Sequence, residues 1–152
     1  MRCQQWGYWM GRFLLGAVFI YAAILKISSP QDFADSIAAY QILPIVVINP
    51  FALGLPFFEL VCGLLVLTGF FLRVGVLGIL SMLIIFIVAL AASLLRGLSI
   101  NCGCFGMHSW FDSNPWIALL RDACLLVISI LIYRYHLTEA EAANRLSPLI
   151  SD

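Results

Sequence analysis

The chain has few charged residues, because Asp, Glu, Lys and Arg together make up only 11% of its 152 residues. An average soluble domain carries about 25%. Hydrophobic residues make up 63% of the chain. A soluble fold with this composition would expose more apolar surface than soluble monomers tolerate. The composition therefore excludes a water-soluble globular protein.

An excess of charge of one sign is also lacking. Eight Lys and Arg residues balance eight Asp and Glu residues, which gives a formal net charge of zero. This balance excludes a basic face for nucleic acid and an acidic solvating tail. Internal repeats and low-complexity stretches are lacking too. We therefore predict one small integral membrane domain in contact with a lipid bilayer.

Four apolar stretches are long enough to cross roughly 30 Å of hydrocarbon as helices. They cover residues of about 8–26, 44–72, 74–95 and 115–135. Helices are expected because backbone polar groups in lipid must be satisfied within the segment. We predict an all-α four-helix membrane bundle over residues 1–137. A short polar tail over residues 138–152 would hold one weak helical turn.

A short additional helix is predicted between the first two spans. Ser29 is a suitable N-cap, Pro30 suits the first helical position, and Asp32 places an acid in the first turn. The apolar residues that follow share one face, namely Phe33, Ile37 and Tyr40. We therefore expect an interfacial helix that ends before residue 44.

The distribution of basic residues predicts the orientation. One side of the membrane would hold Arg2, Arg12, Arg73, Arg134 and Arg145. The other side would hold Lys26, Arg96 and Arg121. The excess places both termini in the cytoplasm and residues 97–114 outside. A cleaved signal peptide is an alternative for the first stretch, although residues 24–26 continue it as a helix end.

The expected outer segment contains the sequence Cys102-Gly103-Cys104. A disulfide between these two cysteines closes a small, strained ring, and strained disulfides are more oxidising. Gly103 allows the backbone conformations that such a ring needs. We predict that Cys102 and Cys104 are the catalytic thiols of a disulfide exchange.

Other roles stay open for the cysteines. The pair could form structural disulfides, remain reduced, or bind a soft metal together with His108, although we predict no metal site. Cys62 and Cys124 lie in apolar spans. There they could pack as small hydrophobic residues or act as resolving partners of the loop pair.

Four charged residues fall within or at the ends of the spans, and such residues often mark function. They are Lys26, Glu59, Arg121 and Asp122. Lys26 and Arg121 could snorkel to the interface, but Glu59 is too short and too deep. We predict a buried polar cluster beneath the cysteine segment that neutralises its own charges. A cation beside a cysteine favours the reactive thiolate.

Five stretches together resemble the MauE/DoxX group of membrane proteins, and its MauE-like branch in particular. They are residues 16–26 with Pro30 and Phe33, 40–44, 55–59 with Gly63, 102–106 and 120–122. The resemblance implies a four-helix bundle in the bacterial inner membrane with its cysteine motif outside. It also implies a thioredoxin-like partner and a role in disulfide formation during methylamine utilisation.

The DoxX side of the resemblance implies a link to quinones. Quinone-linked disulfide-generating enzymes use Cys-x-x-Cys, whereas this chain has Cys-x-Cys, so a quinone rests on analogy. By that analogy it would lie near Glu59, Arg121, Phe105 and Trp116.

Two other functions remain as alternatives to the thiol–disulfide oxidoreductase. One is a non-catalytic membrane anchor or assembly factor for a redox partner. The other is a small transporter that uses the charge cluster, for which a homo-oligomer could supply the missing bulk.

We expect Cys102 and Cys104 to form an accessible disulfide in native membranes. A membrane-impermeant alkylating reagent should label the pair only after treatment with a thioredoxin-like dithiol. A pair that is labelled without reductant, or that is reduced only on unfolding, contradicts the exchange hypothesis.

Overall fold

The computed structural model describes residues 2–41, 44–96 and 115–146, with side chains over 5–41, 44–96 and 116–138. Every element in these ranges is a helix, as predicted. The helices are α1 (Arg2–Ser28), α2 (Pro30–Ala39), α3 (Ile45–Thr68), α4 (Leu72–Leu95) and α5 (Pro115–Leu146).

Four of the five helices are long and apolar enough to cross a membrane. The spans are Gln5–Ser28, Ile45–Thr68, Leu72–Leu95 and Trp116–Thr138. This confirms the all-α membrane bundle and makes the chain a multi-pass membrane protein. The remaining helix, α2, connects the first two spans, as the Ser29-Pro30 start signal predicted.

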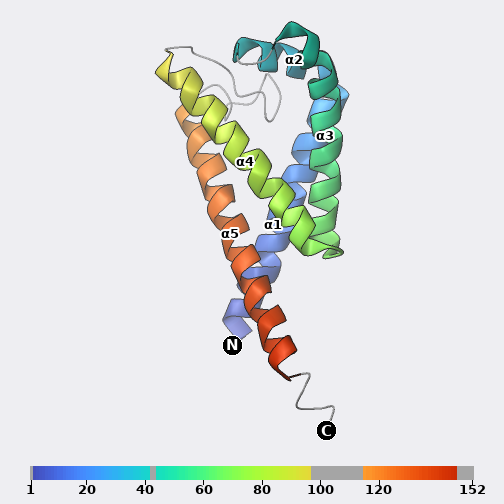
Figure 1. Ribbon diagram of the computed structural model, residues 1–152, viewed down its shortest axis with the longest axis vertical. Coiled ribbons are helices and arrows are strands. Elements are labelled where there is room, and N and C mark those ends of the chain that lie inside the picture. The colour runs from blue at the N-terminus through green and yellow to red at the C-terminus, as the bar shows by residue number, and fades with distance from the viewer. Residues whose placement is uncertain (1, 42–43, 97–114, 147–152) are drawn as a thin grey trace.

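The helices form an elongated bundle in which α1 lies beside α3 and α5 lies beside α4 (Figure 1). The N-terminal end of α1 and the C-terminal end of α5 lie at the same end of the bundle. Helix α2 lies at the opposite end. The end of α4 and the start of α5, which flank residues 97–114, lie at the α2 end as well. We call the end with the start of α1 and the end of α5 the terminal end, and the opposite one the α2 end.

The turn between α3 and α4 differs from the prediction. The expected second span reached residue 72, but α3 ends at Thr68 because Gly69 adopts a left-handed conformation with φ of 81°. The Gly69 N–H donates to the Leu65 carbonyl at 2.9 Å, which closes the last turn of α3. Helix α4 then begins at Leu72.

The C-terminal segment also differs from the prediction. One weak helical turn was expected after residue 138, but α5 continues past the end of its apolar span at Thr138 to Leu146. Polar residues therefore extend this helix beyond the apolar layer.

Helix α2 is held by its apolar face. Phe33 and Ile37 are buried against Ile48 and Ala52 of α3. Tyr40, just beyond α2, packs with Leu90 of α4 and Ala118 of α5. These contacts seat α2 across the α2 end of the bundle.

Close packing of α1 on α3 depends on two glycines. A Cβ atom at Gly16 would lie 3.0 Å from the Gly63 carbonyl oxygen, and one at Gly63 would lie 3.2 Å from the Gly16 oxygen. Small residues at a helix contact let backbones approach where hydrocarbon provides no hydrophobic driving force. Beside this contact, Leu15, Phe19 and Val66 form part of the buried core.

We expect Gly63→Leu to lower the free energy of unfolding by about 1–3 kcal/mol, because the new side chain overpacks the α1 contact. Gly54→Leu is the matched control in the same helix, since nothing lies within 4 Å of a Cβ there. Unfolding in detergent measures both variants. Equal effects of the two substitutions contradict this account of the helix contact.

Candidate functional site: a buried charge cluster

The centre of the candidate site is an ion pair between α1 and α3. Lys26 Nζ donates a hydrogen bond to Glu59 Oε2 at 2.6 Å. The two side chains are only 2% and 4% exposed. Burial of an isolated charge in this setting is costly, so each residue depends on the other.

The direction of Lys26 follows from the antiparallel packing of α1 and α3. Gly63 packs between Gly16 and Ile20, so Glu59 lies nearer the bundle centre than Lys26 by about one turn, or ~6 Å. Helical side chains lean toward the N-terminus of their own helix. Lys26 and Glu59 therefore reach toward each other. The snorkelling interpretation of Lys26 is wrong, because its ammonium group points into the bundle.

Two aromatic rings complete the surroundings of the Lys26 ammonium group. Nζ lies 5.2 Å from the ring centroid of Phe33 in α2 and 5.3 Å from that of Phe86 in α4. Ring faces attract a cation at such distances. Lys26 thus contacts groups from α2, α3 and α4 at once.

Helix α5 contributes a second charged pair. Arg121 donates from Nε and Nη2 to the same oxygen, Asp122 Oδ1, at 3.0 and 2.9 Å. The Asp122 side chain is 5% exposed and that of Arg121 is 20% exposed. Because the pair lies within two turns of the start of α5, it belongs to the α2-end half of that helix.

Both charged pairs line one small cavity of about 30 Å³. Its walls come from all four membrane-spanning helices and include Lys26, Glu59, Arg121, Asp122 and Phe86. A space of this size suits about one water molecule. Two cations and two carboxylates thus line one small, formally neutral site.

The comparisons with known proteins agree on one family. The family model described as methylamine utilisation protein MauE matches residues 4–135. The chain belongs to the MauE family. The methylamine utilization protein MauE of Paracoccus denitrificans is 29% identical over 126 residues, which cover 82% of this chain and 67% of that protein.

A second MauE relative agrees with this assignment. The MauE protein of Methylophilus methylotrophus is 33% identical over 116 residues, or 76% of this chain and 61% of that protein. The chain therefore spans about two thirds of the length of these relatives. No solved structure matches the chain. The matches concern MauE, and the DoxX likeness stays a prediction.

Two of the four predicted thiols of this MauE family member lie within the described residues. Cys102 and Cys104 lie outside the described residues, as do Phe105 and His108. Cys62 and Cys124 are free thiols. Cys62 is buried in the core, one turn from Glu59, whereas Cys124 is exposed on α5. Their proposed role as resolving partners stays a prediction.

The sequence analysis missed the structural role of Arg12. This residue is only 7% exposed, and it donates from Nε to the Val66 carbonyl at 3.2 Å and from Nη2 to the Leu67 carbonyl at 3.3 Å. The last carbonyls of a helix lack internal partners and attract cations. Arg12 thus caps the C-terminal end of α3. The sequence signal for this role was the position of Arg12 inside an apolar stretch.

We expect Lys26→Met to lower the free energy of unfolding by about 3–5 kcal/mol, because Glu59 is left as an uncompensated buried charge. The double variant Lys26→Met/Glu59→Leu should recover much of this loss. Unfolding in detergent of Lys26→Met, Glu59→Leu and the double variant completes a double-mutant cycle with the wild-type protein. Additive effects, with a coupling below about 0.5 kcal/mol, contradict a functional ion pair in the bundle.

Proposed function

We propose that this MauE family member exchanges disulfides with a thioredoxin-like partner at the outer membrane face, in support of methylamine utilisation. Cys102 and Cys104 are the exchanging pair. The observation that carries the proposal is the convergence of Lys26, Glu59, Arg121 and Asp122 around one cavity. Such a charge cluster inside a membrane is retained at a cost and so favours function over packing alone.

The position of the cluster supports a connection with the cysteine segment. Residues 97–114 join α4 to α5, and both flanking helix ends lie at the α2 end (Figure 1). Arg121 and Asp122 lie about 9 Å along α5 from its first residue, at 1.5 Å per residue. The cluster therefore anchors the first turns of α5, to which the cysteine segment is attached.

The exchange reaction balances without a further reagent. A thiolate of the partner dithiol attacks one sulfur of the Cys102–Cys104 disulfide, which breaks that bond and forms a mixed disulfide. The second thiolate of the partner then displaces the bound sulfur. The partner leaves as a disulfide, and Cys102 and Cys104 keep two electrons and take up two protons. The reverse sequence oxidises the pair.

The charged residues act as positioning residues in this proposal. Lys26 and Glu59 hold α1 against α3, and Arg121 with Asp122 brings α5 to the same cavity. Arg121 is the most exposed member of the cluster. A guanidinium group on the helix that follows the cysteine segment favours a thiolate there.

A quinone does not fit within the charge cluster itself. The cavity has about 30 Å³, which suits about one water molecule and not a six-membered ring. Trp116, the other described residue of the expected quinone site, is 66% exposed. We therefore derive no step through a quinone, and a quinone site near the cluster stays a prediction.

Location follows from the same proposal. We place the protein in the bacterial inner membrane with both termini in the cytoplasm. The terminal end of the bundle then faces the cytoplasm, and the α2 end faces outward. This orientation presents the cysteine segment to a partner outside the membrane.

We expect a thioredoxin variant that keeps only its attacking cysteine to form a mixed disulfide with the wild-type chain in membranes. The partner cannot resolve this adduct, so it is detected as a reducible band of added mass. The adduct should disappear in Cys102→Ser/Cys104→Ser. It should persist in the matched control Cys62→Ser/Cys124→Ser.

Two results oppose the proposal. An adduct that survives loss of both Cys102 and Cys104 assigns the exchange to other thiols. If the proteins of methylamine utilisation whose disulfides depend on this chain still form them fully in Cys102→Ser/Cys104→Ser, the chain is assigned to the membrane anchor alternative.

A further inference from the structure

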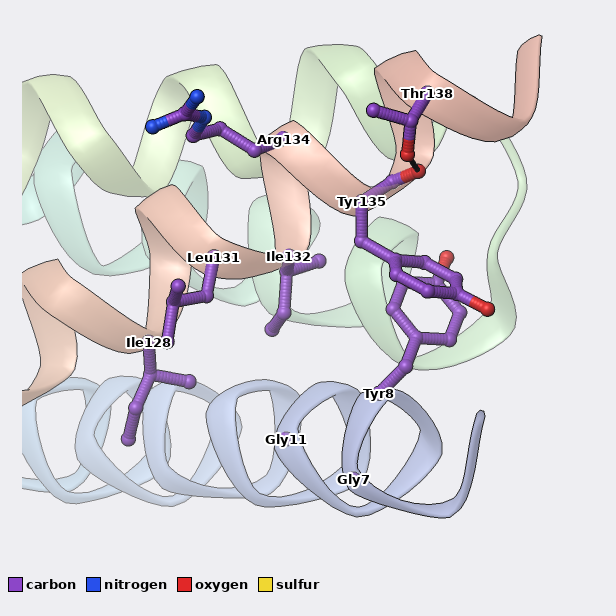
Figure 2. Close-up of a pocket in the computed structure, with 9 residues that line it drawn as sticks. All are labelled: Gly7, Tyr8, Gly11, Ile128, Leu131, Ile132, Arg134, Tyr135 and Thr138. Atoms are coloured by element: carbon purple, nitrogen blue, oxygen red, sulfur yellow. Dashed lines mark hydrogen bonds between the residues drawn. The ribbon is translucent and has the colours of Figure 1, made fainter. Parts of the chain in front are cut away.

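A second, larger cavity lies between α1 and α5 near the terminal end of the bundle. It has a volume of about 590 Å³ and is separate from the charge cluster. Figure 2 shows α1 and α5 side by side, with Ile128 and Ile132 directed from α5 toward α1. The rings of Tyr8 and Tyr135, tilted by 32° with their centroids 4.7 Å apart, lie at one end of the cavity. We call this cavity the α1–α5 groove.

The groove exists because α1 presents glycine instead of side chains along this face. A Cβ at Gly7 would meet nothing within 4 Å, whereas one at Gly11 would make ordinary contact with Ile128 and Ile132 at 3.6–3.7 Å. The helices therefore touch at Gly11 and leave an open space near Gly7. Packing of α1 on α5 is correspondingly less extensive than its packing on α3.

The position of the groove makes lipid its natural occupant. Its walls belong to two membrane spans, Gln5–Ser28 and Trp116–Thr138. The lining is mainly apolar, so water would find few hydrogen-bonding partners inside. Tyr8, Trp9 and Tyr135 lie at the terminal end of these spans, where aromatic residues mark the membrane interface. A chain that enters here runs from the interface toward Ile128.

The edge of the groove carries a positively charged side chain. Arg134 lines the groove, is exposed, and turns its guanidinium group away from α1 (Figure 2). Among the described side chains, no carboxylate lies within ion-pair distance of Arg134. A basic residue close to one membrane face attracts anionic lipid headgroups.

We propose that the α1–α5 groove is a binding site for an anionic phospholipid. One acyl chain lies along Gly7 and Gly11 against the isoleucines of α5, and the phosphate binds Arg134. The proposal does not rest on the thiol chemistry, since the groove shares no lining residue with the charge cluster.

The test uses the full-length protein in nanodiscs or detergent, with phosphatidylglycerol and phosphatidylcholine as probes. Native mass spectrometry counts the lipid that remains bound. The wild-type protein should retain phosphatidylglycerol in preference to phosphatidylcholine. Arg134→Gln should weaken phosphatidylglycerol retention about fivefold, as expected for one arginine near a charged headgroup, and leave phosphatidylcholine unchanged.

Filling the groove tests the acyl chain separately. Gly7→Leu should reduce retention of both lipids, because its side chain occupies the space of the chain. Arg73→Gln and Gly54→Leu are matched controls, since both residues are exposed and lie outside the groove. These controls should retain lipid as the wild-type protein does.

Three results overturn the proposal. One is phosphatidylglycerol retention that changes equally in Arg134→Gln and Arg73→Gln, which shows a general charge effect. Another is retention unaffected by Gly7→Leu. The third is a dimer in light scattering that Gly7→Leu abolishes, which identifies the groove as an interface between two copies of the chain.

Discussion

The Lys26–Glu59 ion pair is the interaction on which the rest of the bundle depends. Hydrocarbon offers no solvent for a charge, so neither residue is tolerated without the other. Their bond at 2.6 Å sets the relative position of α1 and α3. The rings of Phe33 and Phe86 then bring α2 and α4 to the same ammonium group. Helix α5 joins through the cavity that Arg121 and Asp122 line.

Helices α1 and α3 are fixed at three levels. The ion pair lies toward the α2 end, the Gly16–Gly63 contact follows, and Arg12 caps α3 at the terminal end. Directional hydrogen bonds at both ends and close backbone packing between them leave little freedom for sliding. Among the described side chains, the terminal half of the α1–α5 contact has neither a glycine pair nor an ion pair that would draw the two helices together. Helix α5 therefore packs mainly on α4 and contacts the α1–α3 pair less closely.

Much of this fold could be predicted from the sequence. Four spans followed from apolar length, and α2 followed from Ser29-Pro30 and the spacing of Phe33 and Ile37. The depth of Glu59 identified it as a buried charge, because a short carboxylate side chain cannot reach the interface. The end of α3 was missed, since the left-handed conformation of Gly69 is not visible as an interruption of the apolar stretch.

The details of the site required tertiary structure. The inward direction of Lys26 depends on the antiparallel register, which no local pattern contains. The capping role of Arg12 depends on carbonyl groups 54 and 55 residues further along the chain. The sequence alone therefore showed which charged residues lie within the spans, but it could not assign their partners. The cysteine pair remains a sequence-based prediction, because residues 97–114 lie outside the described structure.

The two halves of the bundle differ in chemical character, and the two proposed sites lie in different halves. Toward the α2 end, two cations and two carboxylates share a space for about one water molecule, so charge is balanced internally. Toward the terminal end, the groove is apolar and its arginine has no acidic partner among the described side chains. The first arrangement stabilises helices beneath the proposed exchange site and leaves no net charge for a lipid or a transported ion. The second leaves a positive charge for a ligand from the membrane.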